Sequence, residues 1–203
     1  MRRRVKGREA SDIYQLKQEI LGELEALSEG QKLDLYYADE ASVALTPCVP
    51  YAWQFADEEA FMPSEQGKGV NCFALLSRDN RAVIETTTQT MTGQFLFEQF
   101  ERFSVGLKRL TVVVLDNAAV HRARIIKERL SVWQQRGLFL FYLPRYSPHL
   151  NIVETLWRKL RYEWLAAKDY ETRETLCYAV RLALKAVGTS LRINFSGFNF
   201  SLR

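Results

Sequence analysis

The stretch Thr111-Val112-Val113-Val114-Leu115 is an uninterrupted strand-like run, and Asp116 follows it directly. Continuous β-branched runs of this kind belong to strands that are buried on both faces of a sheet covered by helices. In such sheets the functional groups gather at the carboxyl ends of the central strands. The run therefore predicts an α/β protein with a carboxylate at the edge of its sheet.

The sequence on either side of this strand alternates between strand-like and helix-like patterns. β-branched or alternating runs predict strands, whereas apolar residues three and four apart predict helices. We expect strands over residues 33–38, 42–46, 51–55, 70–76, 81–85 and 138–143, and helices over residues 91–103, 120–135, 151–166 and 172–187. This order indicates a mixed central sheet flanked by helices.

A further helix is predicted near the N-terminus, between a Ser11 N-cap and a stop at Gly30. Its apolar side chains are spaced three and four apart: Ile13, Leu16, Ile20, Leu24 and Leu27. The pattern is compatible with a helix that packs on the sheet and equally with a linker to something upstream. We therefore divide the chain into a basic segment with a linker helix (1–32), an α/β domain (33–190) and an aromatic tail (191–203).

The composition argues against secreted and membrane proteins. No apolar run approaches the length of a membrane span, and the basic start of the chain is not followed by the apolar region of a secretory signal. The cysteines Cys48, Cys72 and Cys177 are few, odd in number and widely separated. They indicate reduced thiols in a cytoplasmic protein, and neither a disulfide framework nor a zinc site.

Basic residues are grouped along the chain, although the net charge of +4 is modest. The groups are Arg2, Arg3, Arg4, Lys6 and Arg8; Arg122, Arg124, Lys127 and Arg129; and Arg145, Arg158, Lys159 and Arg161. A polyanionic partner would explain basic residues close in sequence to acidic ones. Solvated Lys and Arg on helix surfaces would explain them as well.

Three acidic residues, Asp39, Asp116 and Glu154, are the candidate catalytic residues. The first two follow predicted strands, and the third opens a predicted helix. A pocket of carboxylates suits Mg²⁺ or Mn²⁺, and two such ions can clamp the attacking and leaving oxygens of a phosphodiester. The structural alternatives are that Asp116 caps the following helix and that Glu154 only complements the helix dipole. Glu154, however, borders an apolar helix face, where a carboxylate needs a partner.

Two neighbouring residues have roles that the sequence leaves open. Glu40 follows Asp39, and strand alternation directs their side chains to opposite faces of the sheet. One of the two is therefore expected to lie in solvent or to contact a metal ligand without binding the metal itself. His121 lies one helical turn beyond Asp116. It is compatible with contact to a phosphate and equally with a hydrogen-bonded structural role.

These segments resemble the catalytic domain of DDE transposases of the insertion sequence 630 and mariner superfamily. The matching pieces are Tyr37-Ala38-Asp39-Glu40-Ala41, the segment from Val114 to His121, and the long segment Leu143-Pro-Arg-Tyr-Ser-Pro-His-Leu-Asn-Ile-Val-Glu154-Thr-Leu-Trp157. The resemblance covers residues 33–164. The sequence departs from the family pattern where Asn151 runs directly into Ile152, a place where the family often has proline.

The resemblance implies a ribonuclease H-like fold in which Asp39, Asp116 and Glu154 hold a pair of Mg²⁺ or Mn²⁺ ions. It implies cleavage of the ends of a mobile element and attack of the freed 3′-hydroxyl on target DNA. We expect DNA contacts from His121, Arg122, Arg145, Arg158, Lys159 and Arg161. We also expect a homodimer and a bacterial, cytoplasmic location at the nucleoid. Helix-turn-helix domains are expected to be absent from this chain or supplied separately. The alternatives are a silent truncated copy that only binds DNA or a partner, and a ribonuclease H-like nuclease with another substrate.

Overall fold

The computed structural model describes residues 11–46 and 69–195 of the 203-residue chain. A five-stranded sheet with the order β3-β2-β1-β4-β5 forms its centre. The strands are β1 (Asp34–Val43), β2 (Val70–Leu76), β3 (Ala82–Thr87), β4 (Thr111–Leu115) and β5 (Leu138–Tyr142). β1, β2 and β3 pair in antiparallel fashion, whereas β4 is parallel to both β1 and β5. The expected mixed sheet is therefore present.

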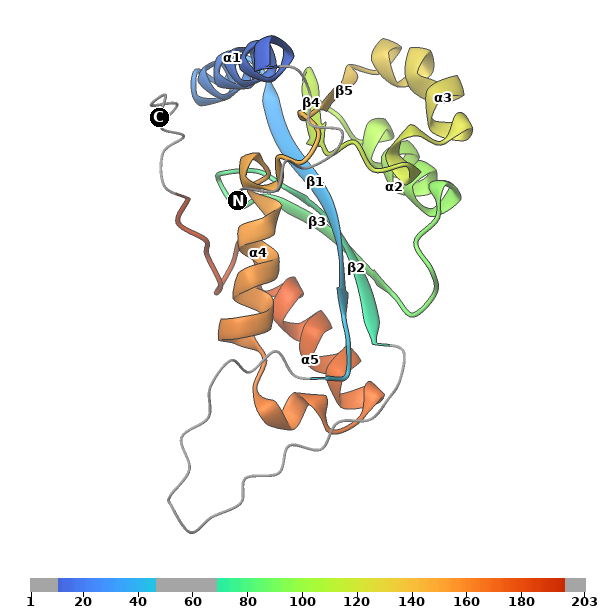
Figure 1. Cartoon of the computed structure of the whole chain (residues 1–203), viewed down its shortest axis with the longest axis vertical. Helices are drawn as coiled ribbons and strands as arrows, with labels where there is room; N and C mark the ends of the chain where they lie inside the picture. Colours follow the sequence, from blue (N-terminus) through green and yellow to red (C-terminus); the bar gives the residue numbers. More distant parts are fainter. Residues whose placement is uncertain (1–10, 47–68, 196–203) are drawn as a thin grey trace, which may run out of the picture.

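Helices cover both faces of this sheet (Figure 1). On one face α4 (Val153–Lys159) and α5 (Arg173–Lys185) pack on alternate strand residues such as Tyr37 and Val114. On the other face α2 (Gly93–Val105) and α3 (Arg124–Gln135) pack on the intervening residues, such as Ala38 and Val113. All five residues of β4 are buried, as its sequence predicts.

The N-terminal helix α1 (Ser11–Glu29) ends at Gly30, as expected, but its buried face differs from the predicted one. Leu21 is fully buried against the sheet, whereas Ile13, Leu16 and Leu27 are 44–55% exposed. The cause is a polar contact: Glu25 is buried and accepts hydrogen bonds from Tyr37 of β1 and from Arg78 after β2. Satisfying this carboxylate rotates the apolar stripe towards solvent. Of the two alternatives, the structure shows packing on the sheet.

Several other element boundaries differ from prediction. β1 continues to Val43, so residues 42–43 extend this strand and a separate strand over 42–46 does not form. The helix predicted over 120–135 is interrupted at Ala123, because a 3₁₀ turn (Val120–Arg122) precedes α3. The helix predicted over 151–166 continues from α4 as a π turn (Leu160–Trp164). The strand predicted over 51–55 lies outside the described residues.

The described part of the tail packs on the domain. Ile193 is buried, and the Asn80 side chain both donates to its carbonyl oxygen and accepts from its N–H, at 3.0 and 2.7 Å. Gly188 lies at a φ of +82°, and a Cβ there would come within 2.4 Å of the Asn80 carbonyl oxygen. The predicted tail therefore starts as a docked segment. No helix in the described part of the chain is long and apolar enough to cross a membrane.

Candidate active site

The first acidic pair lies where the parallel strands β1 and β4 separate. Their ladder ends with Tyr37 opposite Val114, and Asp39 and Asp116 both lie two residues further on. β4 ends at Leu115, so Asp116 follows its strand as predicted. Asp39, by contrast, lies inside β1, because that strand continues through antiparallel pairing with β2. The prediction that Asp39 ends its strand is wrong, but the shared register still brings both carboxylates to one cavity.

Strand alternation sends Asp39 and Glu40 to opposite faces of the sheet, as expected. Asp39 lies on the α4 side, where the Trp157 Nε1–H donates to its Oδ2 at 3.0 Å. Glu40 lies on the other side, where both of its oxygens contact His121 Nε2, at 2.8 and 3.0 Å. Asp39 is therefore the residue that shares a face with Glu154.

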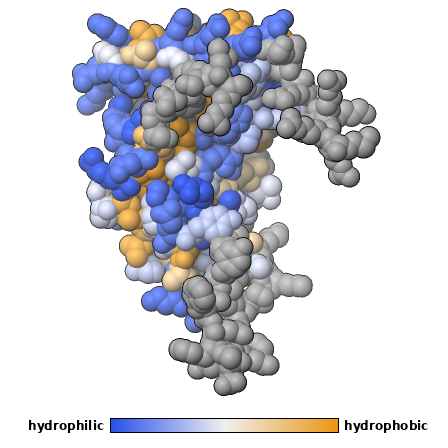
Figure 2. All heavy atoms as spheres, turned by 60° about the vertical axis from the view of Figure 1, so that its left-hand side comes forward, coloured by the Kyte–Doolittle hydropathy of each residue, from blue (hydrophilic) through white to orange (hydrophobic). Residues whose placement is uncertain are grey.

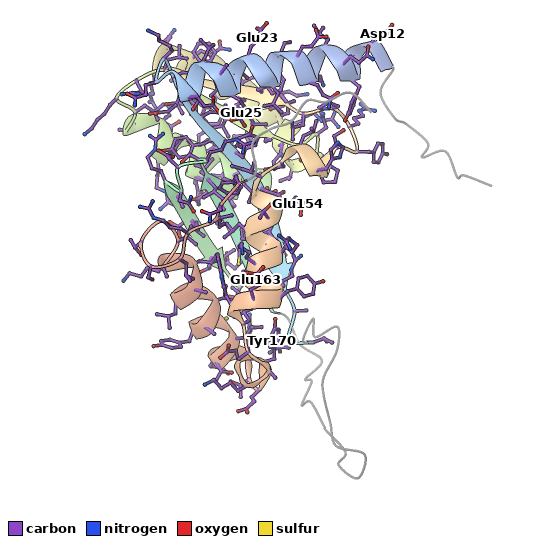
Figure 3. All side chains as sticks on the ribbon, turned by 90° about the vertical axis from the view of Figure 1, so that its left-hand side faces the viewer. Asp12, Glu23, Glu25, Glu154, Glu163 and Tyr170 are labelled. Carbon is purple, nitrogen blue, oxygen red and sulfur yellow. The ribbon has the colours of Figure 1, made fainter. Side chains whose placement is uncertain are left out.

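The third carboxylate, Glu154, comes from the first turn of α4 (Figure 3). Asn151 fixes this helix start, since its side chain donates to the Ala38 carbonyl oxygen at 2.9 Å and accepts from the Val153 N–H at 3.1 Å. Buried Val153 and Trp157 then leave Glu154 exposed on the helix, beside the sheet edge. The side-chain amide of Asn151 thus fixes the start of α4 relative to β1, at Ala38, the residue before Asp39.

Asp39, Asp116 and Glu154 line one cavity of about 460 Å³. The loop after β5 forms another wall, and the other lining residues are Asn117, Ala118, Arg122, Pro144, Arg145, Tyr146, Ser147, Pro148 and Asn151. Residues 39, 116 and 154 are far apart along the chain, so only the fold can bring them to a common cavity. Arg122 and Arg145 are exposed, and they add positive charge to its lining.

The electrostatics of the cavity differ from one carboxylate to the next. Burial raises the pKa of Asp39 to about 7, and the nearby negative charges of Glu154 and Glu40 add to this. Burial also acts on Asp116, but hydrogen bonds from His121 and from the Ala118 N–H outweigh it and lower the pKa of that carboxyl. At neutral pH Asp116 is therefore readily ionised, whereas the ionisation of Asp39 costs free energy.

His121 is fully buried between two carboxylates. Its Nδ1 lies 2.7 Å from Asp116 Oδ1, and its Nε2 lies 2.8 Å from Glu40 Oε1. Burial alone would lower the pKa of His121, but these contacts outweigh burial and raise it to about 10. The expected DNA contact of His121 is therefore corrected, because an enclosed ring with both nitrogens occupied cannot reach a phosphate. His121 has the alternative, hydrogen-bonded role.

The other expected DNA-binding residues divide into two groups. Arg122 and Arg145 reach the cavity, whereas Arg158, Lys159 and Arg161 lie further along α4 and the π turn and do not line it. Lys159 pairs with Glu163 at 2.6 Å, and Arg161 donates to the Ser42 carbonyl oxygen at 3.4 Å. Among the described residues no ion pair joins Arg158 to Glu154, although the two are one helical turn apart.

Sequence reasoning missed the residues that hold the candidate carboxylates in place. Asn117 donates to the Leu143 carbonyl oxygen and fixes the loop after β5, and Asn151 and Trp157 link α4 to β1. An Asn just before a helix is a recognisable cap signal, so Asn151 was open to detection. Trp157 was predicted only as a packing residue, and nothing in its spacing indicates that its indole meets Asp39.

A divalent cation fits the chemistry of this cavity. The donors are carboxylate oxygens, which Mg²⁺ and Mn²⁺ prefer. No ion pair involves Asp39 in the described part of the chain, and burial together with the charges of Glu154 and Glu40 raises its pKa. As they stand, no three His, Cys, Asp or Glu side chains in the described ranges are grouped tightly enough to hold a metal. The three carboxylates share a cavity, and holding an ion would require their side chains to converge.

Comparisons with known proteins identify the family of the chain. A family model described as "DDE superfamily endonuclease" matches residues 34–177. An uncharacterized 39 kDa protein of insertion element IS630 from Shigella sonnei is 27% identical over 158 residues, which cover 75% of this chain and 43% of the relative. The chain thus spans less than half the length of this curated relative.

Solved structures with a similar fold include transposase assemblies. A crystal structure of the Mos1 strand transfer complex has a TM-score of 0.53 at 14% identity, covering 92% of this chain and 58% of that one. A Mos1 mariner paired end complex with Mn has a TM-score of 0.50 at 13% identity, covering 92% and 67%. At such identities the likeness concerns the fold, and it confirms the expected ribonuclease H-like architecture.

The family model spans all three carboxylates, the strand that contains Asp39 and the strand that Asp116 follows. The fold and the family match, which covers more than half of the chain, therefore lead to one conclusion: the chain belongs to the DDE superfamily of endonucleases.

Proposed function

We propose that this domain cleaves the DNA at the ends of a mobile element and transfers the freed strand to target DNA, with Mg²⁺ or Mn²⁺ at Asp39, Asp116 and Glu154. The observation that carries the proposal is the single cavity that these three carboxylates line together with Arg122 and Arg145. A pair of divalent ions bound there would activate the attacking oxygen and stabilise the leaving oxygen. The Mn-containing Mos1 complex supports this choice of ion.

The protein's own residues have separable tasks in this proposal. His121 and the Ala118 N–H both contact Asp116 Oδ1. These contacts fix the carboxylate and leave Oδ2 to bind a metal ion. Trp157 restrains Asp39 in the same way. Arg122 and Arg145 would bind the phosphates on either side of the scissile bond.

The proposed contact with DNA extends beyond the cavity. Arg158, Lys159 and Arg161 would follow the backbone away from the cavity, along α4. The similar solved structures include a paired-end complex with a left transposon end, and this supports a homodimer on two element ends. Helix-turn-helix domains would recognise those ends, and we place the reaction on DNA at the bacterial nucleoid, in the cytoplasm.

A plasmid-nicking assay tests the proposal. With Mg²⁺ or Mn²⁺ the wild-type domain should nick supercoiled DNA, and EDTA should stop it. Asp116→Asn should reduce nicking at least a hundredfold, because removing a ligand charge from a metal site removes its function. Glu174→Gln, at an exposed carboxylate of α5 that does not line the cavity, is the matched control.

Two outcomes would contradict the proposal. One is nicking by Asp116→Asn at the wild-type rate, with circular dichroism showing both proteins folded. The other is cleavage of an RNA–DNA hybrid in preference to DNA duplex, which would favour a ribonuclease. Calorimetry with Mn²⁺ should show heat of binding for wild type and Glu174→Gln and none for Asp116→Asn.

A further inference from the structure

Tyr146 has an unusual backbone conformation at the rim of the acidic cavity. Its φ is +58°, in the left-handed region that side chains other than glycine, asparagine and aspartate rarely adopt. The other non-glycine residues with positive φ in the described part of the chain are Gln31 and Asn80. Gln31 follows the end of α1, and Asn80 is a residue type that tolerates this region. Tyr146 has neither explanation.

The side chain of Tyr146 is also left exposed. It is 62% accessible although it lines the cavity, and no hydrogen bond, ion pair or ring contact holds it among the described residues. Its neighbours Pro144 and Ser147 are buried. The ring therefore contributes little to the core that would compensate for the strained backbone.

The loop that carries Tyr146 is braced along its length. Asn117 and Lys17 both donate to the Leu143 carbonyl oxygen, the latter at 3.4 Å. The Tyr14 hydroxyl and His149 Nε2 are 3.0 Å apart, and Asn151 binds β1. A braced loop that keeps an aromatic ring outside, at a strained residue, is typical of a functional position.

We propose that Tyr146 is a substrate-binding residue that stacks on an unpaired nucleobase of the DNA strand whose phosphate lies at the carboxylates. The proposal rests on the proposed function, since it requires DNA in this cavity. Bases stack on aromatic side chains with little regard to sequence, and each stack contributes about 1–3 kcal/mol. Arg145, the preceding residue and also part of the cavity lining, would hold the adjacent phosphate.

Binding of a single-stranded oligothymidylate in Ca²⁺, measured by fluorescence anisotropy, tests the proposal without requiring cleavage. Tyr146→Ala should weaken binding at least fivefold, which corresponds to about 1 kcal/mol. Tyr146→Phe should bind within twofold of wild type, because the ring rather than the hydroxyl stacks. Tyr178→Ala is the matched control, because Tyr178 is 70% exposed on α5, outside the acidic cavity.

Tyr146→Gly separates a binding role from a structural one. Glycine adopts positive φ without strain, so this variant should keep or raise the wild-type melting temperature while it binds DNA as weakly as Tyr146→Ala. A lower melting temperature for Tyr146→Gly would show that the ring supports the loop and would overturn the proposal. Wild-type affinity in Tyr146→Ala, or no binding by the wild type, would overturn it too.

A crosslinking experiment locates the contact directly. Irradiation of the wild-type domain with an oligonucleotide that carries 5-iododeoxyuridine should attach the base to Tyr146, within the tryptic peptide of residues 146–158. Attachment only to other peptides would count against the proposal. Since neither experiment measures strand cleavage, an inactive domain that still shows the Tyr146-dependent binding would refute the proposed activity and leave this inference standing.

Discussion

At the scale of single residues, His121 determines how charge is distributed at the site. Carboxylate oxygens accept hydrogen bonds, so a ring placed between Glu40 and Asp116 must carry a proton on each nitrogen to satisfy both. The raised pKa of His121 follows from this geometry. The resulting positive charge balances Asp116 but lies on the opposite side of the sheet from Asp39, which remains costly to ionise.

The first prediction concerns Asp39. Its pKa is raised from 3.8 to about 7, so ionisation opposes folding. The penalty is complete above pH 7 and disappears as the pH falls towards 4. In EDTA, Asp39→Asn should increase the free energy of unfolding by roughly 1–3 kcal/mol at pH 8 and by much less at pH 5. Urea unfolding at both values checks this, and a variant less stable than wild type at pH 8 would contradict it.

The second prediction concerns the indole that restrains Asp39. Trp157→Phe removes the Nε1–H donor, so Mn²⁺ affinity should fall by about tenfold, as is typical when a residue behind a ligand is lost. Calorimetry measures the affinity. Trp133→Phe is the matched control, because the Trp133 Nε1–H also donates to a carboxylate, Glu101 Oε2 at 2.8 Å, on the α3 side. The idea fails if both variants bind Mn²⁺ equally well.

At the scale of elements, the polar attachment of α1 is the least expected feature. Glu25 has a side chain only 8% exposed, and it joins α1 to β1 through Tyr37 and to the end of β2 through Arg78, at 2.7 Å. An N-terminal linker would not need a buried carboxylate. We propose that the folded domain includes α1, and that the division at residue 33 should move upstream to residue 11.

The third prediction follows from this attachment. Glu25→Ala removes the buried carboxylate that accepts hydrogen bonds from Tyr37 and Arg78, so the variant should lose about 2–4 kcal/mol of stability. Urea unfolding measures the loss. Glu23→Ala, at an exposed position on the same helix, should change stability by less than about 0.5 kcal/mol (Figure 3). Similar stabilities for the two variants would show that α1 is attached in some other way.

At the scale of the whole molecule, the distribution of charge matters more than the total. Hydrophilic side chains dominate the described part of the face shown in Figure 2, with apolar patches between them. Some basic groups are neutralised locally: Glu101 binds Arg129 and Arg136 at 2.6 and 2.7 Å, and Arg124 pairs with Glu128 at 3.0 Å. Arg122 and Arg145, in contrast, have no ion pair among the described residues and line the acidic cavity. They are therefore the cations best placed for DNA.

The fourth prediction uses the salt dependence of DNA binding. Each phosphate contact contributes about 0.7–0.9 to the slope of log K against log salt concentration. Arg122→Ala and Arg145→Ala should each weaken binding and reduce the slope by about 1. Anisotropy titrations over a range of salt concentrations give the slope. Arg124→Ala should leave it unchanged, and an equal loss of slope in all three variants would indicate diffuse attraction without specific phosphate contacts.

The local sequence determined much of the fold, because local physics decides those features. The buried strand β4 and strand β2 have the predicted bounds. A short, continuous apolar run is typically buried as a strand inside a sheet covered by helices. Helix α5 also lies where apolar spacing indicates, after a Thr172 N-cap. The carboxylates Asp39, Asp116 and Glu154 were identifiable as candidates because each follows or borders an apolar segment. A charged group in such a place is costly unless it has a partner.

The tertiary structure alone decided which of these groups meet. The register of β1 against β4 brings Asp39 and Asp116 to one cavity, and the amide of Asn151 fixes the start of the helix that adds Glu154 to its lining. No local pattern encodes either arrangement. The same holds for His121, whose burial depends on Glu40, 81 positions away. Strand register and the pairing of distant polar groups depend on the whole core, so a sequence read segment by segment names the candidate catalytic groups but cannot bring them together.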